Sequence, residues 1–370
     1  MGKALVAGLL LTASCGRLGF PDQALKCGQP TRFQVGATGI TAIATTPTPD
    51  GFAVFIVAAD KVVRGWSYDY QTDQLVAAAQ NVQLATSATS AIGAASNGSQ
   101  IMLSAMYGSP ATGTALFGLD PTLATMGQGM HDASLATTSP VASSGTGFAF
   151  ATVGTSTPTD VSVRQVTATG IDAGAPVKIV AAAEAPGSVS IISTATGYAV
   201  AYTAATPNPN QNRIELLDAS FAIVAGPVTA SSTALDPGTP HIAWAPVSNT
   251  YLVAWSEKTS GGGDNLWMQL RGPMLEVVTP PTLISTHGVS PQVTTDGTGF
   301  WMTWKDISTT PNFLDAAHVA PDGTVVPRAV TNSGGAPVRW AMVERLDQPV
   351  LVWTETAGSG PDLYFDPMCN

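Results

Sequence analysis

The chain repeats one pattern of turn and strand seven times at nearly constant spacing. Equivalent positions recur every 47 to 53 residues or so, and Trp255, Trp304 and Trp353 follow one another at about 49. The apolar strands of the seven repeats begin near Phe52, Ile101, Phe148, Tyr198, Tyr251, Phe300 and Val350. A period of this length restricts the fold to architectures built from repeated supersecondary units.

Each repeat predicts four short antiparallel strands. A proline such as Pro240 or Pro291 often opens the first strand. Proline has no backbone N–H, but at the first residue of a strand this N–H is not needed for a hydrogen bond to the neighbouring strand. A turn such as Asp50-Gly51 then supplies the positive φ angles of a tight hairpin. The aromatic strand follows, and after a longer polar loop come a third and a fourth strand. With 37 Gly, 27 Pro and only 11% charged residues, the composition favours strands and turns over helices.

Seven four-stranded repeats are typical of propeller blades. We therefore predict an all-β fold over residues 31–370, a single seven-bladed β-propeller of four-stranded antiparallel blades. The repeats resemble bacterial propeller repeats written as a Pro-x-Val strand, a Gly-Phe turn and a Val-x-Trp strand, over about residues 31–368. That resemblance defines a blade rather than an activity, so it implies no catalytic residue.

The seventh repeat lacks its fourth strand, and residues 31–35 form a strand without a repeat. We expect this N-terminal strand to close the last blade by pairing antiparallel with residues 361–365, which removes an open sheet edge. The pairing would bring Cys27 near Cys369. A disulfide between them would stabilise the fold by about 5 kcal/mol in the chain-entropy model. The alternative is two free thiols in the chain ends.

The first 14 residues indicate a signal peptide, with Lys3 before an apolar run over residues 4–11. Residues 11–15, Leu-Thr-Ala-Ser-Cys, resemble a bacterial lipobox, although Thr12 stands where Leu is usual. The resemblance implies cleavage before Cys15, acylation of that cysteine and a linker through residue 30. The alternative is a plain signal peptide with a leftover cysteine. We expect an exported outer-membrane or cell-surface lipoprotein, with a periplasmic location as the alternative.

The net charge and the missing sequence motifs argue against several classes of partner and cofactor. A net charge of −10 argues against nucleic acid as a partner, and the lipid anchor is the expected contact with the membrane. The sequence contains no nucleophile elbow, phosphate-binding loop or dinucleotide fingerprint, and no histidine pair at metal-ligand spacing. We expect no cofactor, no metal and a monomer, with an unidentified protein or glycan as partner.

One face of a propeller carries the connections between second and third strands and those between blades, and we call it the loop face. Longer loops are expected there at 106–113, 153–160, 204–212, 256–265, 305–312 and 354–360. Glu257, Asp306 and Glu355 each follow a strand tryptophan by two residues, which would place three carboxylates on one arc. They could bind a cation or a basic partner. The alternative is that they are solvated strand ends.

His241 opens a first strand, where it is expected to face the axial channel, with Gln292 at the equivalent place in the next repeat. The alternative is a hydrogen-bonded histidine in the channel wall. We expect a non-catalytic binding or scaffold protein at the bacterial cell envelope that uses the loop face. The alternative is a propeller enzyme that acts on glycans or other envelope substrates with these acids and His241.

Overall fold

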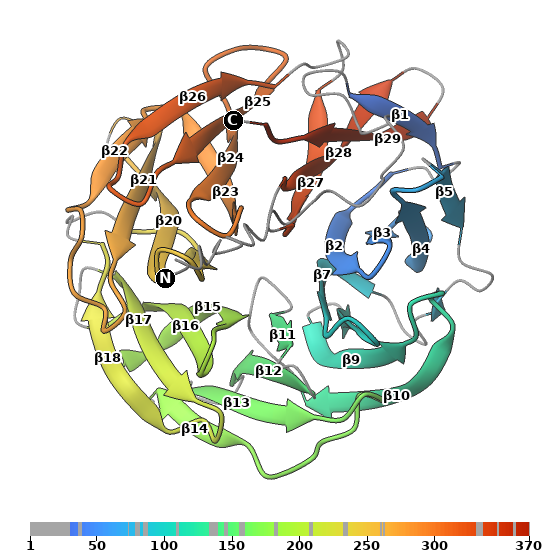
Figure 1. The fold of residues 1–370 in the computed structure, drawn as a ribbon, viewed down its shortest axis with the longest axis horizontal. Helices are drawn as coiled ribbons and strands as arrows, with labels where there is room; N and C mark the ends of the chain where they lie inside the picture. Colours follow the sequence, from blue (N-terminus) through green and yellow to red (C-terminus); the bar gives the residue numbers. More distant parts are fainter. Residues whose placement is uncertain are drawn as a thin grey trace, which may run out of the picture.

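The computed structural model describes residues 30–35, 39–72, 74–77, 82–83, 88–108, 111–132, 140–143, 147–154, 160–180, 184–206, 210–231, 236–259, 261, 263–330, 336–345, 348–357 and 360–369. Seven β-sheets stand in a ring around a central axis (Figure 1). No α-helix occurs in these residues. The prediction of seven four-stranded antiparallel blades is confirmed.

The strands follow one another in chain order within each blade. Blade 1 contains β2 (Ala42–Thr48), β3 (Gly51–Val57), β4 (Val62–Asp69) and β5 (Gln74–Ala77), and the short β6 (Val82–Gln83) also pairs with β4. Blade 2 contains β7 (Ala88–Ser96), β8 (Ile101–Gly108), β9 (Ala111–Leu119) and β10 (Thr125–Asp132). Blade 3 contains β11 (Val141–Ser143), β12 (Phe148–Val153), β13 (Val161–Val166) and β14 (Val177–Val180).

Blade 4 contains β15 (Pro186–Ser193), β16 (Gly197–Ala204), β17 (Gln211–Asp218) and β18 (Ile223–Thr229). Blade 5 contains β19 (His241–Ala245), β20 (Thr250–Lys258), β21 (Asp264–Arg271) and β22 (Thr282–Ser285). Blade 6 contains β23 (Gly288–Thr295), β24 (Phe300–Asp306), β25 (Phe313–Val319) and β26 (Val325–Ala329). Blade 7 contains β27 (Pro337–Val343), β28 (Val350–Ala357), β29 (Gly360–Pro367) and β1 (Thr31–Gln34).

The core lies between the blades. Every residue of β3 is buried, because a second strand has a neighbouring blade against each of its two faces. Separate hydrophobic clusters fill the junctions between successive blades around the ring. The outermost strand of blade 4, β18, is mostly exposed. The blades therefore stabilise one another through their faces.

The N-terminal strand closes the ring as predicted. β1 pairs antiparallel with β29, with Thr31 opposite Phe365. One buried cluster joins blade 1 and blade 7, and Phe33 packs against it. The ring centroid of Phe33 lies 4.8 Å from that of Phe365 and 6.0 Å from that of Tyr68. Beside the axis, Thr45 donates a hydrogen bond of 2.9 Å to the carbonyl of Met342.

The signal peptide, Cys15, the linker and Cys27 lie outside the described residues. Thr31 lies opposite Phe365, and in the sequence Cys27 and Cys369 stand four positions before Thr31 and after Phe365. The disulfide between the two cysteines stays a prediction. The described part of the chain has no helix with the length and hydropathy that a membrane crossing requires.

The predictions of long loops at residues 106–113 and 354–360 are wrong. β8 continues to Gly108 and β9 resumes at Ala111, so most of residues 106–113 is strand. β28 likewise ends at Ala357, and β29 begins at Gly360. These hairpins extend because their alternating residues keep pairing beyond the apolar centre. Among the connections between second and third strands, the longer ones are those after β12, β16, β20 and β24.

We predict that Phe33→Ala lowers the free energy of unfolding by about 2 kcal/mol, because Phe33 fills part of the seam between the first and last blades. Urea denaturation of the wild type and the variant measures the change. Phe313→Ala is the matched control, since Phe313 is 36% exposed on β25 and its loss should change stability by less than about 0.5 kcal/mol. Equal effects of the two substitutions would contradict a stabilising role for β1.

Candidate functional site

The first strands of the blades surround a channel that contains two cavities end to end. One cavity has a volume of about 360 Å³ and the other about 320 Å³. They share lining residues in the middle of the channel: Thr45, Ala94, Val141, Ile191 and Met342. First strands run from the loop face to the opposite face, which we call the turn face. Residues of the larger cavity come earlier in these strands, so it is the loop-face cavity, and the smaller one is the turn-face cavity.

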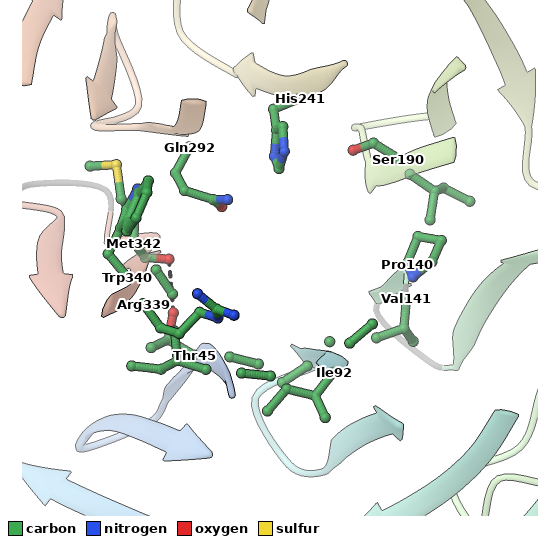
Figure 2. A pocket seen from close by; sticks show the side chains of 18 residues that line it. Thr45, Ile92, Pro140, Val141, Ser190, His241, Gln292, Arg339, Trp340 and Met342 are labelled. Carbon is green, nitrogen blue, oxygen red and sulfur yellow. Dashed lines mark hydrogen bonds between the residues drawn. The ribbon is translucent and has the colours of Figure 1, made fainter. Parts of the chain in front are cut away.

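Four polar side chains converge on the loop-face cavity. Arg339, Gln292 and His241 point toward its centre from blades 7, 6 and 5, and Ser190 lines it from blade 4 (Figure 2). The rest of the wall is mostly small and apolar, with Ala42, Ala44, Ala91, Gly93 and Ala94 among its residues. A small apolar cavity with a few convergent polar groups is the usual form of a ligand site.

The repeat explains why three of these side chains meet. Ser190, His241 and Gln292 pair across their hairpins with Ala201, Ala254 and Thr303. Each partner directly precedes the strand aromatic of its blade, so the three residues occupy one level of the ring. Ala341 holds this level in blade 7, where it pairs with Val352. Arg339 lies two residues earlier and therefore on the same side of β27, nearer the loop face.

Two groups in the channel have shifted pKa values. Burial lowers the pKa of His241 to about 4, so the imidazole is neutral at pH 7. Glu344 lines the turn-face cavity. Desolvation by the surrounding cavity wall raises the pKa of Glu344, although part of the side chain contacts solvent. Of the four residues predicted to bind a ligand, His241 is the one that lines either cavity.

Glu257 and Glu355 are not solvated strand ends. They are 1% and 0% exposed, and each accepts a 2.8 Å hydrogen bond at Oε1, Glu257 from the indole of Trp255 and Glu355 from that of Trp353. Residues two apart lie on the same side of a strand, so the glutamate can reach the indole that precedes it. A buried indole N–H is more stable when it has an acceptor. These acids have a structural partner, and their predicted role in ligand binding stays a prediction.

Asp306 follows Trp304 by two residues, as the two glutamates follow their tryptophans, but its side chain is one methylene shorter. The Nε1 of Trp304 has no acceptor among the described residues, and Asp306 instead accepts a 2.6 Å bond from the Ser308 amide. Partial burial opposes ionisation, but hydrogen bonds from Ser308 outweigh it and lower the pKa of Asp306. Burial and the charge of Asp306 raise the pKa of Asp315. The three predicted acids therefore do not form one site within a described cavity.

A second acidic cluster is buried within blade 4. The Tyr202 hydroxyl lies 3.0 Å from Glu184 Oε2 and 3.1 Å from Glu215 Oε1. A phenol has one proton to donate, so it can bond to both carboxyl groups only when one of them is protonated and donates in return. Burial raises the pKa of Glu215 to about 7, with Tyr202 and Arg213 opposing the rise and Glu184 adding to it. Tyr202 is fully buried, so it has no access to a substrate.

Among the described side chains, no group of three His, Cys, Asp or Glu is placed to hold a metal ion. The expected absence of a metal and a cofactor stays a prediction. Sequence reasoning missed Ser190 and Arg339. Alignment of the first strands with His241 could have found Ser190, but not Arg339, which lies two residues before the equivalent position in blade 7.

The fold and the channel define a seven-bladed β-propeller with a polar axial cavity. No protein-family model matches the sequence, and no curated protein matches it. The crystal structure of Saccharomyces cerevisiae Sqt1 is similar to this chain, with a TM-score of 0.50 and 12% sequence identity. The similarity covers 94% of this chain and 100% of that one. At this identity the likeness shows the fold alone.

We predict that Glu215 makes stability depend on pH. Its folded pKa of about 7 lies above the usual 4.5, so the folded state binds the proton more tightly. This contribution is fully present below about pH 4.5 and is lost as pH rises through 7, a fall of about 3 kcal/mol. His241, whose pKa is lowered to about 4, changes stability in the opposite direction over this range, so the effect of Glu215 is measured as a difference. The unfolding free energy of the wild type minus that of Glu215→Gln, from urea unfolding, should fall by about 3 kcal/mol between pH 4.5 and 8. The same difference for Glu276→Gln, an exposed control, should not show that fall, and identical profiles for wild type and Glu215→Gln would disprove the assignment.

Proposed function

We propose that this chain is a non-catalytic binding or scaffold protein, exported to the bacterial cell envelope and anchored there through Cys15. Its ligand or partner is engaged on the loop face. The observation that carries the proposal is the loop-face cavity, whose neutral polar side chains have no structural partner among the described residues. Within the described part of the chain, the side chains of Ser190, His241 and Gln292 form no hydrogen bond, although each can donate or accept one.

Unused hydrogen-bonding groups in a preformed cavity favour ligand binding, because a ligand can satisfy them at small cost in conformational entropy. The ring closes through buried clusters at its junctions, which holds the first strands in place. Connections on the loop face are the longest in blades 3 to 6, and loops on a rigid scaffold are where binding residues are concentrated.

The alternative function, a propeller enzyme acting on glycans, is less well supported. Glycoside hydrolysis generally requires two carboxyl groups about 5 to 10 Å apart beside the substrate. Among the described residues, no carboxylate lines the loop-face cavity, and Glu344 is the single one in the lining of the turn-face cavity. The carboxyl pair Glu184 and Glu215 lies beside neither cavity.

The anchor is tested on protein purified from membranes of a bacterial expression host. We expect metabolic labelling with an alkynyl fatty acid to modify the wild type and not Cys15→Ser, which should be released from the membrane. Non-reducing peptide mapping of the same sample should find Cys27 linked to Cys369. An unmodified mature N-terminus, or free thiols at both positions, would contradict export by this route.

The binding face is tested with full-length labelled protein and an isolated cell-envelope preparation. The double variant Lys258→Glu and Lys305→Glu reverses two positive charges on the loop face. Asp50→Lys reverses one negative charge in an exposed turn on the opposite face. We expect the loop-face variant to bind about tenfold more weakly and the control to bind like the wild type. Protease and glycosidase treatment of the envelope then separates a protein from a glycan partner. Loss of binding in the turn-face variant alone would overturn the assignment.

A further inference from the structure

We propose that the loop-face cavity binds a small carboxylate that also bears hydroxyl groups, such as a sugar acid, and that Arg339 holds the carboxylate. The inference rests on the proposed function, because it names the ligand class for the same face of the ring.

Arg339 is positioned by backbone groups rather than by an acid. Its Nε donates to the carbonyl of Thr41 at 2.5 Å, and its Nη1 donates to the carbonyl of Val338 at 2.7 Å. A guanidinium has five N–H donors, so these two bonds fix its orientation and leave donors for a ligand. The side chain is exposed and points into the cavity (Figure 2).

Five other arginines form ion pairs with an aspartate or a glutamate. Within the described residues, an aspartate or glutamate neutralises each of Arg32, Arg64, Arg164, Arg213 and Arg328. Arg339 forms no ion pair there, and no acid lines its cavity. A cation held at the edge of a cavity without a counter-charge is suited to an anionic ligand, since Arg binds carboxylates with strong charge-assisted hydrogen bonds.

The remaining lining determines what kind of anion fits. Arg339 supplies one positive charge and His241 is neutral at pH 7, so a monoanion is balanced whereas a dianion is not. Gln292, His241 and Ser190 offer neutral donors and acceptors that match hydroxyl groups. The cavity of about 360 Å³ with alanine walls limits the ligand to a small molecule.

The loop face carries charges of both signs. The lysines Lys61, Lys178, Lys258 and Lys305 stand at loop-face ends of strands or in loop-face turns, and so do the aspartates Asp60, Asp160, Asp264 and Asp306. Among the described residues, none of these aspartates lines the cavity, whereas Arg339 does. The guanidinium inside the cavity, rather than the charge of the whole face, therefore favours an anion.

Isothermal titration of the full chain at pH 7 with sodium glucuronate, glucose and inorganic phosphate tests the ligand class. We expect glucuronate to bind, and glucose and phosphate to bind at least about tenfold more weakly. Arg339→Gln should lose glucuronate binding by about tenfold or more. Arg164→Gln removes the same charge from β13, outside the cavity, and should bind like the wild type. Equal binding of glucose and glucuronate, or full binding by Arg339→Gln, would overturn the proposal.

Gln292→Leu provides a second test that leaves the arginine intact. It should weaken glucuronate but not acetate, because acetate has no hydroxyl group to contact Gln292. Thermal melting of each variant identifies any that fails to fold, in which case the other variant decides the outcome. If glucuronate does not bind while the loop-face variant still loses envelope binding, the ligand class is wrong and the proposed function stands.

Discussion

Apolar packing between neighbouring blades is the interaction on which the structure depends. Each blade has two apolar faces, and a closed ring covers both faces of all seven blades. The critical contact is the pairing of β1 with β29, because it joins strands from the two ends of the chain, and β1 then leads into β2 of blade 1. β1 completes the sheet of blade 7, while Phe33 adds to the cluster that contains Tyr68 and Phe365. The axial cavities exist because this closure holds the first strands in a ring.

The repeat made the architecture predictable. Turn signals and strand aromatics at a constant period indicated the number of blades, and the orphan strand at residues 31–35 indicated how the ring closes. These features are local in sequence, and the ring follows from them because every repeat needs the same two neighbours. The hairpins of blades 2 and 7 were harder to predict, since strand length beyond the apolar centre depends on pairing rather than composition.

Burial depth was the main source of error at the predicted site. Glu257 and Glu355 follow strong strands, which in sequence resembles an exposed strand end. In the structure the preceding indole needs an acceptor, and a glutamate at the second following position supplies it. Trp304 and Asp306 show how exact this requirement is. Asp306 is one methylene shorter and accepts from the Ser308 amide, and Trp304 has no acceptor among the described residues.

The channel site was predicted in part. His241 and Gln292 could be placed at one level because each follows a proline and precedes a β-branched residue. In blade 7 the proline, Pro337, stands four residues before Ala341, which occupies that level, so the same pattern does not point to Arg339. The register of β27 depends on how the two strands pair, and residue types alone do not give it.

Net charge also proved a poor guide to the local field. Part of the acidity of this chain arises from turn chemistry, because aspartate accepts hydrogen bonds from hairpin amides. Acids of the loop face also have partners, since Glu257 accepts from an indole and Asp160 pairs with Lys178. Among the described residues, no carboxylate lines the loop-face cavity, whereas the guanidinium of Arg339 does. An acidic propeller can therefore offer an anion site in its channel, because a ligand there contacts the arginine directly while the acids lie outside the lining.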